Sequence, residues 1–257
     1  FMKLGFIGTG KIASSVIFGI CRSKIKFKQI IVSPRNKRIA KNLKKKFKKV
    51  SIAKDNQDVI NKSNWIFLSV TPIVGEKIIK KLKFKSSQTI ISFISTIGLS
   101  DLKRMIKVKS KVVRAIPLPP ISIKKGPVPI YPPNKKVKFF FDKIGSTIEI
   151  KNEKLSINFW STSGMMASYY EILQIMSNWL IKKGIKRQDA QKYITSLFLA
   201  LSEDAVVNSK KDLRHLVKES QTPNGLNEQG LKEMKKRGIY KSIVNSLNSI
   251  YKRINKK

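Results

Sequence analysis

The sequence is poor in cysteine, histidine and acidic side chains. Its 257 residues include 1 Cys, 1 His and 15 Asp or Glu, against 54 Lys or Arg. A single cysteine excludes an internal disulfide, and the lack of a Cys/His cluster argues against a structural zinc site. Long apolar runs are also missing, so we expect no membrane span, no signal peptide and no metal, and we predict a cytoplasmic protein.

The shortage of acids leaves a formal net charge of +39. Lysines are spread along the whole chain, as in 35-RNKRIAKNLKKKFKK-49 and 252-KRINKK-257. Arg, which is better suited to hydrogen-bond the edges of DNA bases, is sparse. Lys, Ile and Asn are all abundant, which is typical of A/T-rich codon usage. We therefore expect a solvated lysine surface and no specific nucleic-acid site. Duplex DNA should bind weakly, at low salt only.

Near the N-terminus an apolar segment meets two glycines, in 3-KLGFIGTGKIASSV-16. The residues before Gly8 are typical of a buried strand, and those after Gly10 have helical spacing. A strand that turns into a helix there would direct N–H groups at an anion. Gly8 would allow the turn, Gly10 would let a pyrophosphate approach, and Ala13 would let the helix pack closely. The pattern predicts dinucleotide binding; the alternative is an ordinary strand–turn–helix.

Strand and helix patterns alternate through the first half of the chain. Beyond the opening strand, strands are expected at 29–33, 50–53, 65–70, 89–95 and 112–116, with helices at 35–47, 55–63, 75–84 and 99–106 between them. A proline-rich stretch, 117–133, surrounds a candidate strand at 127–131, and a helix at 135–144 and a strand at 147–150 follow. These patterns predict an α/β Rossmann-like domain over residues 1–153, with a mostly parallel sheet.

Beyond residue 153 the strand patterns end. Helices are expected at 154–160, 164–183, 187–208, 212–219, 226–236 and 239–254. The apolar stripes of 164–183 and 187–208 are too broad for a small domain to bury alone. We therefore predict an all-α domain over residues 154–257 that forms a homodimer or higher homo-oligomer.

The end of the second expected strand indicates which nucleotide is bound. NAD-specific proteins of this fold carry an acid there that binds the ribose 2′-hydroxyl. Here the segment reads 31-IVSPRNKR-38, without a carboxylate. Ser33, Arg35, Asn36 and Lys37 stand where a 2′-phosphate would lie, and Arg suits a phosphate. The pattern favours NADPH, with NADH as the second candidate.

Five segments resemble the pyrroline-5-carboxylate reductase family, in the family's order and spacing. GFIGTGKIAS at 5–14 resembles its GFIGAGNMA start, and 65-WIFLSVTP-72 resembles VFLAVKP. Further along, 112-VVRAIPLPP-120 resembles VVRVMPNTP, and 181-IKKGIKRQDA-190 resembles KLGLPRELA. Finally, 219-ESQTPNGLNEQGL-231 resembles TSPGGTTIAGL.

The resemblance implies an activity and an assembly. Family members reduce the cyclic imine 1-pyrroline-5-carboxylate to proline with NADPH or NADH. They pair through the helical domain, and the active site lies between the nucleotide domain and helices that include the partner's. Their SPGGTT loop holds the substrate carboxylate with N–H groups at a helix start. It maps onto Thr222, Pro223, Asn224, Gly225, Leu226 and Asn227; the alternative is a helix turn without a ligand.

The sequence departs from the family at the expected site. Leu118 replaces the Asn of PNTP, and Thr71 replaces the Lys of VKP. Leu226 and Asn227 replace the two Thr residues of the substrate loop. These changes leave the substrate open, as well as whether the chain is catalytically active.

The candidate residues fall into three groups. The predicted cofactor-binding residues are Gly8, Thr9, Gly10, Lys11, Ile12, Ser33, Arg35, Asn36 and Lys37, with Val70, Thr71, Pro72, Ser95 and Thr96 along the wall. The predicted substrate-binding residues are Thr222, Asn224, Gly225, Leu226 and Asn227, of which Thr222 and Asn227 are the candidate catalytic hydrogen-bonding groups. The lone histidine, His215, is expected on a surface helix without a catalytic role.

Three functions stay open. The first is NADPH-dependent reduction of pyrroline-5-carboxylate to L-proline. The second is a related oxidoreductase that acts on another small carboxylate-bearing imine or ketone. The third is a non-catalytic NADP-binding member. The β-hydroxyacid dehydrogenases share the architecture, but the helical half shows no clear catalytic Lys with an Asn four residues on at the right place.

Overall fold

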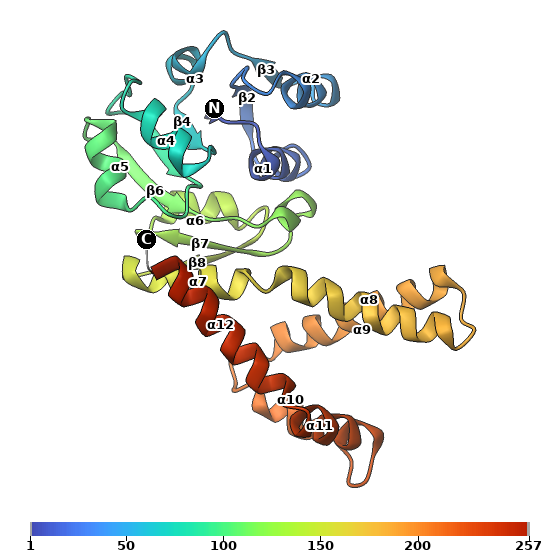
Figure 1. Cartoon of the computed structure of the whole chain (residues 1–257). Coiled ribbons are helices and arrows are strands. Elements are labelled where there is room, and N and C mark those ends of the chain that lie inside the picture. The colour runs from blue at the N-terminus through green and yellow to red at the C-terminus, as the bar shows by residue number, and fades with distance from the viewer. Residues whose placement is uncertain (1, 256–257) are drawn as a thin grey trace. The chain divides into compact units, whose positions relative to one another are not determined.

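The computed structural model describes residues 2–255 and divides into two compact units, residues 1–156 and residues 157–257. The first unit contains the sheet, and the second consists of helices (Figure 1).

The first unit is built on one eight-stranded sheet. Its strands are β1 (Met2–Ile7), β2 (Phe27–Val32), β3 (Val50–Ile52), β4 (Trp65–Leu68), β5 (Thr89–Ser92), β6 (Lys111–Ala115), β7 (Pro127–Tyr131) and β8 (Ser146–Glu149). Their order is β3-β2-β1-β4-β5-β6-β7-β8. All neighbours are parallel except β6 and β7, which are antiparallel. The predicted Rossmann-like, mostly parallel sheet is confirmed.

Helices cover both faces of this sheet (Figure 1). One core joins the sheet to α1 (Lys11–Cys21), α2 (Lys37–Lys46), the short 3-10 helix η1 (Pro119–Ile123) and α6 (Lys135–Phe141). The other joins it to α3 (Asn56–Lys62), α4 (Pro72–Ile79) and α5 (Leu99–Ile106). Successive strand residues feed opposite cores: Phe6 belongs to the first and Ile7 to the second. Continuous apolar strands such as β4 therefore bury both faces.

The helix predicted at 75–84 is displaced in the structure, where α4 spans Pro72–Ile79. Pro72 stands in the first turn, where its fixed φ suits a helix and its missing N–H costs no hydrogen bond. Strands β4 and β5 also end two and three residues before the predicted ends, 70 and 95. The residues between the observed and the predicted strand ends belong to the loops that follow β4 and β5, at the carboxyl ends of the strands.

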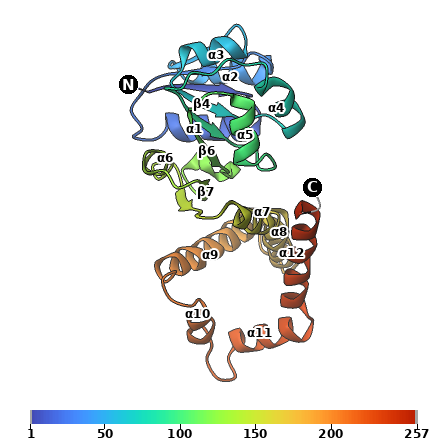
Figure 2. The ribbon, with the colours of Figure 1, turned by 90° about the vertical axis from the view of Figure 1, so that its left-hand side faces the viewer.

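The second unit contains the helices α7 (Ser156–Ser163), α8 (Met166–Lys182), α9 (Arg187–Val207), α10 (Arg214–Glu219), α11 (Leu226–Lys236) and α12 (Ile239–Asn255). The short 3-10 helix η2 (Glu153–Leu155) precedes them. Figure 2 shows α10 and α11 lying away from the α8–α9 pair. Among its described residues, Ala190 and Ile194 are the only buried hydrophobic side chains. No helix within residues 2–255 is both long and apolar enough for a transmembrane span.

Candidate nucleotide and substrate site

The carboxyl ends of four adjacent parallel strands bring the predicted cofactor residues to one edge of the sheet. The chain passes from β1 to β2 on one side, and β4 pairs with the other side of β1. Such a reversal of strand order opens a crevice where α/β proteins bind ligands. The loops that follow β1, β2, β4 and β5 all lie at this edge.

The first loop has the conformation that a phosphate-binding turn requires. Gly8 has φ +99°, and a methyl group on its Cα would lie 2.2 Å from the Ser69 carbonyl oxygen. A methyl group on Gly10 would meet no heavy atom within 4 Å. Gly10 is the N-cap residue of α1, without a side-chain cap, and the Thr9 hydroxyl is buried without a hydrogen-bond partner among the described atoms. The loop is therefore closely packed at Gly8 and has open space at Gly10.

The residues after β2 divide into a buried serine and exposed groups. Ser33 is 1% exposed, and its hydroxyl oxygen accepts a hydrogen bond from the Gly8 N–H at 2.9 Å. Asn36 caps α2 by accepting a bond from the Ile39 N–H at 3.2 Å. Arg35 and Lys37 are exposed. Ser33 and Asn36 thus shape the two loops, and the exposed cations are available to a ligand.

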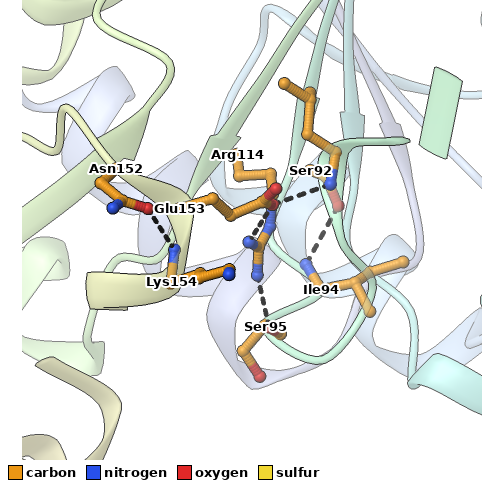
Figure 3. A network of polar contacts seen from close by, with 8 residues as sticks. Ser92, Ile94, Ser95, Arg114, Asn152, Glu153 and Lys154 are labelled. Atoms are coloured by element: carbon orange, nitrogen blue, oxygen red, sulfur yellow. Dashed lines mark hydrogen bonds and ion pairs between the residues drawn. The ribbon is translucent and has the colours of Figure 1, made fainter. Parts of the chain in front are cut away.

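The loops after β4 and β5 contain the remaining predicted cofactor residues. Thr71 and Thr96 are exposed, and Val70 and Ser95 are half-buried. The Ser95 carbonyl accepts a bond from Arg114, a buried β6 residue that we did not predict from the sequence (Figure 3). A charge inside the apolar strand 112-VVRAI-116 is a signal that could have found it, because buried charges need partners.

Two cavities lie between helices that cover the sheet. One, of about 640 Å³, lies between α1 and α2 and shares only Lys11 with the predicted cofactor residues. The other, of about 480 Å³, lies between α4 and α5 and includes Thr96. Neither is lined by Gly8 or Gly10. The helix start and its open glycine lie instead in the loop after β1, where an anion would be received.

The predicted substrate loop lies in the second unit, just before α11. Asn224 has φ +59°, and the Gly225 N–H donates to the Thr222 carbonyl at 2.8 Å. The first N–H groups of α11 lack intrahelical acceptors by geometry, as an anion site requires. A carboxylate already contacts the loop: Glu228 accepts a bond from the Asn224 N–H at 2.8 Å. Lys232 donates to the same carboxylate, and this bond is the main cause of the lowered pKa of Glu228.

The candidate polar groups for the imine are exposed. Asn227 uses its amide Nδ2 to donate to the Ser220 carbonyl at 2.8 Å, which closes the loop. Thr222 is exposed, whereas His215 is half-buried and its ring nitrogen Nδ1 lies in hydrogen-bond contact with the Asp212 carbonyl. Within residues 2–255, no group of three His, Cys, Asp or Glu side chains could hold a metal ion.

Family models match both halves of the chain. Residues 3–96 match the model described as NADP oxidoreductase coenzyme F420-dependent. Residues 155–257 match the model for pyrroline-5-carboxylate reductase dimerisation. The second match supports self-association of the helical half.

Whole-chain relatives agree with these models. A pyrroline-5-carboxylate reductase from Synechocystis is 22% identical, over 98% of this chain and 97% of the relative. The fold is that of the Streptococcus pyogenes 1-pyrroline-5-carboxylate reductase (TM-score 0.83, 24% identity, 100% and 99% coverage). It is equally that of the NADP-bound Plasmodium falciparum pyrroline carboxylate reductase (TM-score 0.83, 20% identity, 98% and 97% coverage). With both halves and the whole fold in agreement, the chain belongs to the pyrroline-5-carboxylate reductase family of NAD(P)-dependent oxidoreductases.

Proposed function

We propose that the protein reduces 1-pyrroline-5-carboxylate to L-proline with NADPH. The observation that carries this proposal is the loop after β1, where Gly10 leaves open space at the start of α1. The Thr9 hydroxyl, buried without a partner, is a further group that a bound phosphate suits. These features fit a dinucleotide. The proposal assigns residues 1–153 to the nucleotide, and 154–257 to dimerisation and substrate; the cytoplasmic location stays a prediction.

The chain's own residues would bind and orient the reactants. The helix start at Gly10 would receive the pyrophosphate, and Arg35 and Lys37 would pair with the 2′-phosphate. NADPH, when bound, would supply the hydride for the imine carbon, and solvent would supply the proton for the imine nitrogen. Thr222 or Asn227 would hydrogen-bond that nitrogen, while the start of α11 holds the substrate carboxylate.

Consumption of NADPH with pyrroline-5-carboxylate, followed by identification of proline, tests the proposal. Turnover that yields proline would support it. NADPH binding without turnover on this imine would contradict it. A panel of other carboxylate-bearing imines and ketones would then separate a related oxidoreductase from a non-catalytic member.

One observation favours the related oxidoreductase as a second candidate. The loop that should hold the substrate carboxylate already binds the carboxylate of Glu228. Compared with the family's SPGGTT loop, Leu226 and Asn227 also replace the two threonines. A substrate other than pyrroline-5-carboxylate would explain the departures at this loop.

Arg35→Ala is expected to weaken NADPH binding and to leave NADH binding nearly unchanged. Arg35 is exposed beside the nucleotide edge, and a charge-assisted contact to the 2′-phosphate contributes about 1–3 kcal/mol. Titration calorimetry with both cofactors measures the difference. Arg38→Ala removes a similar exposed cation from α2 and serves as the control. Equal losses for NADPH and NADH would show that Arg35 does not read the 2′-phosphate.

Asn227→Ala is expected to lower turnover about 10-fold and to leave the NADPH dissociation constant unchanged, because the amide would contact the imine and not the cofactor. Steady-state kinetics and NADPH titration give the two quantities. Gln229→Ala, an exposed change two residues along α11, is the control. Since Asn227 also closes the loop onto Ser220, a matching loss of stability in thermal unfolding would point to a purely structural role.

A further inference from the structure

A buried arginine lies behind the loop that joins β5 to α5, residues 93–98. Arg114 is 5% exposed, and a buried guanidinium is costly unless its donors find acceptors. Its Nη1 donates to Glu153 Oε1 at 2.5 Å, and its Nη2 donates to the Ser95 carbonyl at 2.5 Å (Figure 3). The side chain therefore connects β6, the loop and the segment η2.

Glu153 completes the start of α5. The oxygen that accepts from Arg114 also accepts a hydrogen bond from the Leu99 N–H at 2.8 Å. Leu99 is the first residue of α5, and the N-cap residue Gly98 has no side chain to cap the helix. A helix start has unsatisfied N–H groups and favours a negative charge. Glu153 supplies that cap from a segment 54 residues along the chain.

The loop is consequently held at three successive points. At its beginning the Ser92 hydroxyl accepts a bond from the Ile94 N–H at 3.2 Å. In its middle Arg114 binds the Ser95 carbonyl (Figure 3), and at its end Glu153 accepts a bond from the Leu99 N–H. Two of the three points depend on the Arg114–Glu153 pair. Side chains that close the loop in this way limit the conformations it can adopt.

We propose that Arg114 and Glu153 are positioning residues that hold the β5–α5 loop in the shape that receives NADPH. This inference rests on the proposed function and on the sequence-based prediction that Ser95 and Thr96 lie along the wall of the cofactor site. The pair acts through the loop: a loop ordered in advance loses less conformational entropy when a ligand binds. Because η2 leads directly to residue 156, the same carboxylate also fixes the segment by which the chain leaves the first unit.

Three variants of the full-length protein test the proposal. Glu153→Ala removes both bonds, whereas Glu153→Gln keeps a carbonyl oxygen that can accept them. Glu149→Ala is the matched control, since Glu149 accepts a bond from the N–H of Asn134, the N-cap of α6, at 3.1 Å. Hydrogen–deuterium exchange reports on residues 93–99, and calorimetry measures NADPH affinity without any imine substrate.

Glu153→Ala is expected to speed exchange over residues 93–99 about 10-fold and to weaken NADPH binding by a similar factor. Glu153→Gln should restore both to within about 3-fold, because a neutral acceptor is weaker than a charged one. Glu149→Ala should change neither quantity. Recovery in the Gln variant would distinguish positioning from a general loss of structure.

Two results would overturn the inference. One is unchanged exchange over residues 93–99 in Glu153→Ala. The other is an NADPH affinity in Glu153→Ala that falls no further than in Glu149→Ala. A wild-type protein that does not bind NADPH is a different outcome, because it contradicts the proposed function itself.

Discussion

Gly10→Ala is expected to fold like the wild type and to lose about 100-fold in NADPH affinity, or about 2.8 kcal/mol. The added methyl group meets no heavy atom within 4 Å, so the structure has no reason to change. That open space is where the pyrophosphate would approach the backbone at the start of α1. Thermal unfolding and NADPH titration give the two quantities.

Gly8→Ala is the matched comparison: its main expected effect is a loss of stability, whereas that of Gly10→Ala is a loss of NADPH affinity. Its methyl group would lie 2.2 Å from the Ser69 carbonyl oxygen, at a φ of +99°. Left-handed backbone and overpacking together are expected to cost about 2–5 kcal/mol of stability. A Gly10→Ala variant that binds NADPH like the wild type would show that the cofactor does not approach this backbone. If Gly8→Ala leaves the midpoint temperature of thermal unfolding unchanged, the close approach of the loop after β1 to the loop after β4 is contradicted.

Ile175→Glu is expected to weaken self-association more than about 100-fold, because an unpaired carboxylate buried in an apolar contact costs several kcal/mol. Ile175 is 59% exposed in the single chain, and Trp179, one helical turn later, is also 59% exposed. Both lie on α8, in the half that matches the dimerisation model. Sedimentation velocity at micromolar concentration measures the change in mass.

Gln174→Glu is the control for added charge, since it places a carboxylate on an exposed polar position of the same helix. The wild type should associate more tightly as salt rises, because like charges oppose pairing and salt screens them. A wild type that is monomeric at micromolar concentration would contradict the predicted assembly. Equal association of Ile175→Glu and the wild type would exclude this face of α8 from the contact.

Local periodicity was enough to predict most elements. The helix expected at 99–106 spans Leu99–Ile106, because Leu102 and Ile106 repeat at helical spacing and are buried. The apolar run at 65–70 correctly indicated an inner strand, and β4 pairs on both sides. The displaced α4 shows what periodicity does not locate. The first and last residues of a helix depend on a few side chains, such as a proline in the first turn, whereas periodicity is a property of the whole segment.

The contacts made by the predicted site residues could not be predicted from local sequence patterns. Ser33 was expected beside the cofactor, which stays a prediction; the sequence did not indicate that Ser33 is 1% exposed or that its hydroxyl oxygen accepts a bond from the Gly8 N–H, 25 residues away. Glu228 contacts the predicted substrate loop, and no pattern in the sequence announced that bond. Such contacts depend on the path of the backbone through the turn and not on the residue types alone.

The order of strands and helices, the change to an all-helical half, the dinucleotide motif and the family resemblance could all be recognised in the sequence. Each depends on residues that are close along the chain, or on motifs in a fixed order. The antiparallel direction of β7 against β6 and the pairing of Arg114 with Glu153, 39 residues away, became visible in the fold alone. A strand's direction and a buried charge's partner depend on which distant segments the fold brings together, and local patterns do not contain that information.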